Sequence, residues 1–362
     1  MSDVPHLRFP EFSGEWEETE LQDIVPNICS GKDRISNNGE VTLYGSTGVI
    51  GRTNSVSYKE NIVLVARVGA NAGQMQIGNA PCGVTDNTLV IDAKEWNFYI
   101  YYFLQHYNLN RLVFGSGQPL ITGGMLKKIK VRYGCYAERN KITRLLCLID
   151  ERIATQNKII EDLKLLMDAI IERSYYNRSY HPCRIGDVIE QISERNKDKS
   201  IDMVLSVSNK QGFINQSEQF EDRIIASEDT SNYKIVHKND FAYNPARINV
   251  GSIARLTTIE MGIVSPMYIC FRVRKGVVSE YLEHFFSTSY FFYEMQKRLE
   301  GSVRQCLSFE SICNIPIYIP SSEEQHTIGK KISVLLDKID IETHYHCKLV
   351  EQKHYLLRQM FI

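Results

Sequence analysis

Two long stretches of the chain repeat apolar residues at an alternating spacing of four and three, which is typical of a helix with one apolar face. They cover residues 138–173 and 324–361, and the first contains neither Pro nor Gly. We predict two helices of about 35 residues, each roughly 50 Å long. Each has one apolar face, so we expect the two helices to pack against each other.

The two apolar series differ in regularity. In the first stretch the series consists of Ile149, Ile153, Ile160, Leu163, Met167 and Ile170, with Gln156 as its one polar member. In the second stretch the series consists of Leu336, Ile339, Thr343, Val350, Leu357 and Met360, and His346 and Lys353 interrupt it. We expect the second helix to pack less well than the first.

Each predicted helix follows a segment with the composition of a β-rich domain, in which short apolar runs are separated by glycines. In the first domain, residues 62–66 and 87–91 are predicted as buried strands. Residues 96–107 are predicted as a buried aromatic helix, and residues 125–133 as a last strand in which basic residues alternate.

The order of elements starts again after the first long helix. The series Gly301, Leu307, Ile312, Ile315 and Ile317 repeats Gly115, Ile121, Leu126, Ile129 and Val131 at a constant offset. We therefore predict an α+β fold with two tandem copies of one unit. The domains are expected at residues 1–136 and 176–320, and the helices at residues 137–175 and 321–362. The helices would form an antiparallel coiled coil about a pseudo-two-fold axis.

Composition narrows the function. The chain has 42 Lys and Arg against 43 Asp and Glu, so its net charge of -1 gives no sign of a nucleic-acid binder. A basic stretch at residues 127–144 is either a phosphate-facing surface or a solvated strand edge and helix start. Nine cysteines form no CxxC pair, which fits reduced thiols. With no signal-peptide pattern and no apolar run of about 20 residues, we expect a cytoplasmic protein.

No catalytic motif is recognisable. The chain has no phosphate-binding P-loop, no HExxH and no Cys/His set with metal-ligand spacing. The run Asn244-Pro-Ala-Arg247 lacks the second Pro and the aromatic residue of the amino-methyltransferase signature. We therefore predict a non-catalytic chain.

Polar and basic residues next to glycines are candidates for contacts with DNA, because glycine lets the backbone approach a duplex closely. An alternative is that they form ordinary turns. The candidates in the first domain are Ser46, Thr47, Arg67, Asn71, Gln74, Gln118, Lys127 and Lys128. Those in the second domain are Arg247, Asn249, Ser252, Arg304 and Gln305.

Over nearly its whole length the chain resembles the specificity subunits of type I restriction-modification systems. The resemblance lies in the order of several stretches, residues 7–16, 44–51, 66–71, 149–160, 243–252, 301–304 and 336–361. It implies that each domain reads half of a bipartite site in double-stranded DNA.

The resemblance also implies partners. The helices would set the spacer between the half-sites and bind two adenine methyltransferase subunits, and restriction/translocase subunits would join the full complex. The chain itself would bind no cofactor, because S-adenosylmethionine belongs to the methyltransferase. Two other interpretations remain open: a bivalent protein-binding scaffold, and a specificity region that serves a fused methyltransferase-nuclease.

Overall fold

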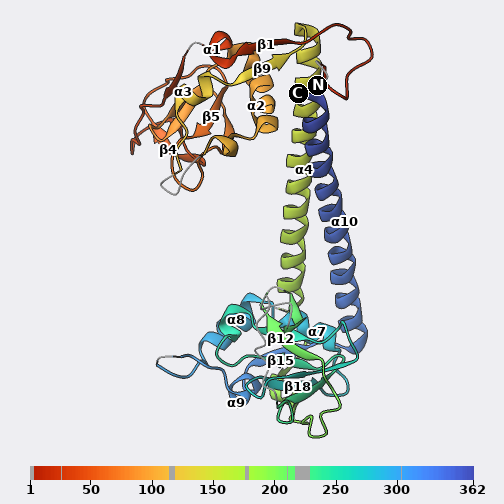
Figure 1. Ribbon diagram of the computed structural model, residues 1–362. Helices are drawn as coiled ribbons and strands as arrows, with labels where there is room; N and C mark the ends of the chain where they lie inside the picture. The colour runs from red at the N-terminus through yellow and green to blue at the C-terminus, as the bar shows by residue number, and fades with distance from the viewer. Residues whose placement is uncertain are drawn as a thin grey trace. The chain divides into compact units, whose positions relative to one another are not determined.

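The computed structural model describes residues 4–25, 27–113, 119–175, 179–209, 211–216, 229–302 and 304–362. The chain forms two compact units (Figure 1). Unit 1 contains Met1–Lys158 and Thr343–Ile362, and unit 2 contains Ile159–Glu342. Each long helix therefore contributes one part to each unit.

Unit 1 combines short strands with the aromatic helix and the first part of a long helix. Its elements are β1 (Glu17–Glu20), α1 (Leu21–Ile24), β2 (Ile28–Ser30), β3 (Val41–Gly45), β4 (Gly48–Thr53), β5 (Ile62–Ala66), β6 (Met75–Gly78), β7 (Cys82–Val84), β8 (Thr88–Ile91), η1 (Lys94–Trp96), α2 (Asn97–Tyr107), η2 (Leu109–Leu112), α3 (Gly123–Lys127), β9 (Lys130–Tyr133) and α4 (Tyr136–Tyr175).

Strand β5 explains the layers of unit 1. All five of its residues are buried, and alternate side chains point to opposite faces of the sheet. Val63 and Val65 pack in the core that contains α2, whereas Ile62 and Leu64 pack against Tyr44 of the other sheet. The sheet ordered β2-β8-β5-β6 therefore lies between helix α2 and the sheet ordered β4-β3-β7.

Unit 2 repeats this plan with an additional strand. Its elements are β10 (His181–Arg184), α5 (Ile185–Val188), β11 (Ile189–Ile192), β12 (Val204–Ser208), β13 (Gly212–Asn215), β14 (Lys234–His237), β15 (Phe241–Tyr243), η3 (Ile248–Val250), β16 (Ile253–Arg255), β17 (Met261–Val264), β18 (Ile269–Val273), α7 (Ser279–Phe285), α8 (Ser289–Gln296), α9 (Phe309–Cys313), β19 (Pro316–Ile319) and α10 (Ser322–Met360).

The sheets of the two units have the same topology. The order β11-β18-β15-β16 in unit 2 matches β2-β8-β5-β6 in unit 1, and β13-β12-β17 matches β4-β3-β7. The central pairs β12–β17 and β3–β7 are both parallel, and strand β14 is an addition to unit 2. The predicted tandem α+β fold is confirmed, because the duplication covers strand order and strand direction.

The long helices pack together within each unit. In unit 1 the first turns of α4 share a core with the end of α10, where Leu146 lies near Leu357 and Phe361. In unit 2 the last turns of α4 share a core with the start of α10, where Ile171 lies near Ile332. The helices are therefore antiparallel, as predicted. Among the described helices, none has the length and apolar character needed to cross a membrane.

The predicted apolar series of α10 is partly wrong. Leu336 is 43% exposed and Thr343 is also exposed, whereas Leu335 is half-buried. The less exposed positions follow the series Ile332, Leu335, Ile339, Glu342, His346, Leu349, Lys353, Leu357 and Met360. His346 and Lys353 therefore belong to the packed face.

Lys353 is compatible with the packed face because its aliphatic carbons are partly buried while its ammonium group is paired. Its ammonium nitrogen lies 2.6 Å from Asp150 Oδ1 on α4. The Tyr102 hydroxyl of α2 donates to Asp150 Oδ2 at 2.9 Å. A polar cluster thus joins three helices of unit 1.

The predicted strand over residues 125–133 is also partly wrong. Residues 123–127 form the short helix α3, and the strand β9 begins only at Lys130. The Thr122 hydroxyl accepts a hydrogen bond from the Met125 N–H and caps this helix. The cap redirects the backbone, and Leu126 becomes buried on the helix.

Candidate nucleic-acid interface

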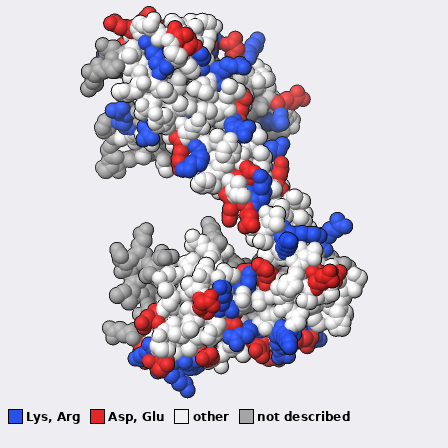
Figure 2. Space-filling model, turned by 90° about the vertical axis from the view of Figure 1, so that its right-hand side faces the viewer, with Lys and Arg blue, Asp and Glu red and all other residues white. Residues whose placement is uncertain are grey.

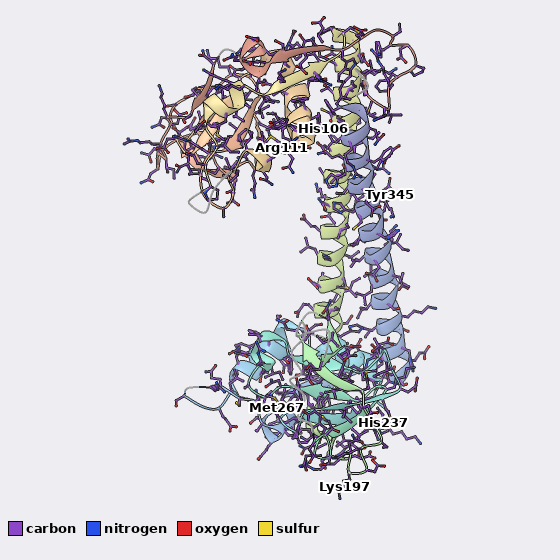
Figure 3. The ribbon with its side chains drawn as sticks, in the orientation of Figure 1. His106, Arg111, Lys197, His237, Met267 and Tyr345 are labelled. Atoms are coloured by element: carbon purple, nitrogen blue, oxygen red, sulfur yellow. The ribbon has the colours of Figure 1, made fainter. Side chains whose placement is uncertain are left out.

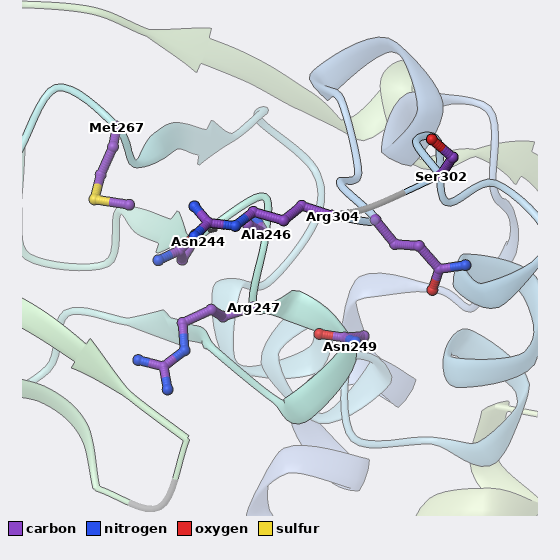
Figure 4. Close-up of a pocket in the computed structure, with 8 residues that line it drawn as sticks. Asn244, Ala246, Arg247, Asn249, Met267, Ser302 and Arg304 are labelled. Atoms are coloured by element: carbon purple, nitrogen blue, oxygen red, sulfur yellow. Dashed lines mark hydrogen bonds between the residues drawn. The ribbon is translucent and has the colours of Figure 1, made fainter.

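A cavity of about 650 Å³ lies on the surface of unit 2, at the ends of its central strands (Figure 4). Three loops form it: the β15–β16 loop, the β17–β18 turn and the loop that carries Ser302, Arg304 and Gln305. Its lining residues are Asn244, Ala246, Arg247, Asn249, Met267, Ser302, Arg304 and Gln305. Four predicted DNA contacts are therefore brought together, although they come from two separate sequence regions.

The β15–β16 loop carries Arg247 and Asn249 on either side of the buried residue Ile248. The Asn244 side chain accepts from the Ala246 N–H at 3.1 Å, and the Arg247 N–H donates to the Asn244 carbonyl at 3.0 Å. Ile248 is 3% exposed and ties the short helix η3 to the core. The loop is thus folded tightly before any ligand binds.

The loop that carries Ser302, Arg304 and Gln305 is closed at its base by two backbone hydrogen bonds. The N–H of Glu300 donates to the Cys306 carbonyl at 2.9 Å, and the reverse bond measures 2.8 Å. Gly301 has a φ of 109°, and a Cβ there would collide with the Arg304 carbonyl. This backbone needs glycine. The Leu307 N–H donates to the Pro245 carbonyl at 3.0 Å, which joins this loop to the first.

The cavity is cationic. Arg247 and Arg304 are exposed, and neither has a carboxylate partner among the described residues. In Figure 4 their side chains extend toward the same part of the cavity as Met267. A guanidinium can contact phosphate oxygens or pair with the O6 and N7 atoms of guanine. This arrangement suits DNA recognition.

In unit 1 two of the predicted residues donate to one backbone carbonyl. The Ser46 hydroxyl and the Arg67 N–H both donate to the Asn87 carbonyl at 3.0 Å. Gln74 donates to Asn71 at 3.1 Å within the β5–β6 loop, and both side chains are exposed. The β3–β4 turn, the β5–β6 loop and the β7–β8 turn therefore meet at the same end of the sheets.

The remaining predicted residues are placed differently. Thr47 is exposed in the β3–β4 turn, and Lys127 and Lys128 lie at the end of α3. Ser252 is 4% exposed, and its hydroxyl donates to the Val207 carbonyl at 3.1 Å instead of facing the cavity. Gln118 lies outside the described residues. Asn244, Ala246, Met267 and Ser302 also line the cavity but were not among the predicted contacts. Ser302 follows Gly301 and fits the rule for residues next to glycine, whereas no local pattern marks Met267.

Much of the basic stretch at residues 127–144 has partners within unit 1. Lys130 and Arg132 contact Glu18 at 2.8 and 2.7 Å, and hold the pKa of its carboxyl below the usual value. The guanidinium of Arg139 lies 3.4 Å from the centre of the Trp96 ring. Acidic and basic side chains are mixed over the face shown in Figure 2. Lys130, Arg132 and Arg139 are therefore engaged within unit 1 and do not form a continuous phosphate-facing surface.

The sequence matches the type I restriction modification DNA specificity domain twice, over residues 13–165 and 177–350. The chain belongs to this family. The resemblance inferred from the sequence is confirmed, and the two matches correspond to the duplicated topology.

Relatives of known name and structure agree with the family. The chain is 22% identical to the type I restriction enzyme MjaVIII specificity subunit of Methanocaldococcus jannaschii, over 93% of this chain and 89% of that protein. The fold is similar to the type I restriction-modification S subunit from M. genitalium, with a TM-score of 0.63, 16% identity and 99% coverage of both chains.

A second solved structure comes from work on complex assembly and conformational transition of the type I restriction-modification system. It aligns with a TM-score of 0.55 and 12% identity, over 96% of this chain and 97% of that chain. At such identities the likeness concerns the family fold.

Proposed function

We propose that each unit of this type I specificity chain reads one half of a bipartite site in double-stranded DNA. The observation that carries the proposal is that equivalent loops bear the same side-chain types. The β5–β6 loop carries Arg67 and Asn71, and the β15–β16 loop carries Arg247 and Asn249. Two similar readers with different loops suit two dissimilar half-sites. Arginines without carboxylate partners in the cavity favour DNA over a protein scaffold role.

We infer that the chain recruits catalysis and performs none itself. In this proposal, two adenine methyltransferase subunits bind the long helices and use S-adenosylmethionine, and restriction/translocase subunits join them. Support comes from exposed apolar residues on the part of α4 that belongs to unit 2: Ile159 and Leu166 are 39% and 49% exposed. Their spacing of seven residues puts them on one helix face, which a partner would cover.

The test of this function is reconstitution. With its methyltransferase partner, the chain is expected to produce N6-methyladenine at one split sequence, mapped by sequencing the methylated DNA. The isolated chain, supplied with S-adenosylmethionine, should transfer no methyl group. Methylation by the isolated chain, or partner-dependent methylation without sequence preference, contradicts the proposal.

A further prediction concerns the spacer between the half-sites. Lengthening both α4 and α10 by one heptad keeps their packed faces in phase. Seven helical residues rise about 10.5 Å, and one base pair occupies about 3.4 Å. We therefore expect the spacer to lengthen by about three base pairs, measured by methylation mapping. If the spacer keeps its length, the helices do not set the distance between the half-sites.

A further inference from the structure

The turn between β17 and β18 holds an apolar side chain out in solvent. Met267, which is labelled in Figure 3, is 56% exposed. Three hydrogen bonds fix the turn: the Tyr268 N–H donates to the Ser265 carbonyl at 3.1 Å, Lys234 Nζ to the Tyr268 carbonyl at 2.6 Å, and the Val207 N–H to the Tyr268 hydroxyl at 3.3 Å. Met267 is thus presented by a rigid support.

The surroundings of Met267 are polar. It lines the same cavity as Arg247 and Arg304, the two guanidiniums without carboxylate partners in the described part of the chain. One exposed methionine is ordinary on a protein surface. An exposed methionine on a fixed turn inside a cationic cavity instead suggests a ligand with an apolar group close to polar atoms.

The duplicated topology identifies the equivalent position in unit 1. In the strand pairing, Ala66 lies opposite Thr88, just as Tyr243 lies opposite Ile269. Asp86 lies two residues before Thr88, and Met267 lies two residues before Ile269. Asp86 is exposed, and it has no cation partner among the described residues.

The position of Asp86 is next to the residues expected to meet DNA. Its neighbour Asn87 receives hydrogen bonds from Ser46 and Arg67. A carboxylate there is repelled by phosphates, so it is favourable only opposite a hydrogen-bond donor. On the major-groove edges of the bases such donors are the exocyclic amines of cytosine and adenine.

We infer that this turn position determines base specificity in both units. Met267 contacts the 5-methyl group of thymine, which is an apolar group on the major-groove edge of the bases. Asp86 accepts a hydrogen bond from the exocyclic amine of cytosine or adenine. The inference rests on the proposed reading of one half-site by each unit, and it names the chemistry that makes the two readings different.

The test for Met267 uses the complex of this chain with its methyltransferase partner and duplexes that carry its mapped site. Each thymine of the half-site read by unit 2 is replaced in turn by deoxyuridine, which lacks the methyl group. One replacement is expected to weaken binding about fourfold, the effect of losing one buried methyl group. In Met267→Ala that difference should disappear.

Met261→Ala is the matched control, because Met261 is 45% exposed on β17 and lines a different cavity. It should keep the difference between thymine and deoxyuridine. A methyl effect that persists in Met267→Ala overturns the assignment. A half-site without thymine also overturns it. An equal loss of affinity for both duplexes in Met267→Ala overturns it as well, because that result would indicate that Met267 inserts between bases.

The test for Asp86 is the methylation pattern of Asp86→Ala. One position of the half-site read by unit 1 should lose its preference for cytosine or adenine, while the other positions keep theirs. Glu40→Ala removes the same charge from an exposed site elsewhere on unit 1, and should leave the pattern unchanged. An unchanged pattern in Asp86→Ala overturns the assignment.

These outcomes are separable from failure of the proposed function. If the complex methylates no split sequence, the reading of half-sites itself fails. If the split sequence is methylated and neither turn variant alters its recognition, only the role of the turn position fails.

Discussion

Replacing both Arg247 and Arg304 with alanine is expected to weaken binding of the assembled complex to its DNA site by at least about 30-fold. Each guanidinium contributes about 1–3 kcal/mol when it contacts a base edge, and two such contacts give at least this factor, since about 1.4 kcal/mol is tenfold in affinity. The loss should be large because neither arginine has a carboxylate partner among the described residues, so each guanidinium is available to contact DNA. Equilibrium binding at a stated salt concentration measures it.

The control for this double variant removes the same charge elsewhere on unit 2. Arg195 and Lys197 are exposed and line a different cavity, so Arg195→Ala/Lys197→Ala should alter binding far less. Salt dependence separates the two kinds of contact. If the arginines contact phosphates, their removal lowers the salt slope by about two. Equal losses in the test and control variants would mean that the cavity does not bind DNA.

Replacing Glu138 with glutamine is expected to lower the free energy of unfolding of unit 1 by about 3 kcal/mol, since breaking one partner of a buried ion pair costs this much. The Glu138 side chain is 1% exposed and that of Arg8 is 16% exposed. Two hydrogen bonds of 2.7 and 2.8 Å join them and raise the pKa of Arg8. Glutamine keeps the volume but removes the charge, and leaves the guanidinium without its partner.

This ion pair also holds the N-terminal segment in place. The Leu7 N–H donates to the Gln359 carbonyl at 2.9 Å, so loss of the pair should also loosen the contact of residues 7–16 with the end of α10. Denaturant unfolding measures the stability, and hydrogen exchange at Leu7 reports the local change. Glu11→Gln, which removes an exposed pair with Lys141, is the control and should leave stability unchanged. A similar stability of Glu138→Gln and the parent chain would contradict the prediction.

The helices and strands with a periodic apolar pattern were predictable, because an element that buries one face has apolar residues at a regular spacing along the chain. Ile149 and Ile160 lie on the packed side of α4 as their spacing indicated, and Gln156, the polar member of the series, is buried with them. The apolar series that repeats at a constant offset is also buried in both units. Leu126 and Ile312 are both fully buried, on the equivalent helices α3 and α9.

The site was only partly predictable. Polar residues near glycines selected Arg247, Asn249, Arg304 and Gln305 as candidates, and the structure brings these four to a common cavity. The same rule selected Ser252, whose hydroxyl is used by a neighbouring strand. A sequence rule of this kind describes the backbone, whereas the direction of a side chain depends on what packs beside it.

The sequence by itself determined the duplication, the two antiparallel helices and the buried strands, because apolar periodicity follows the geometry of a helix or strand. Only the tertiary structure decided which cations stay unpaired, that Leu335 rather than Leu336 is partly buried, and that Met267 stands in solvent among arginines. These features depend on contacts between residues far apart in the chain, and no local spacing encodes such contacts.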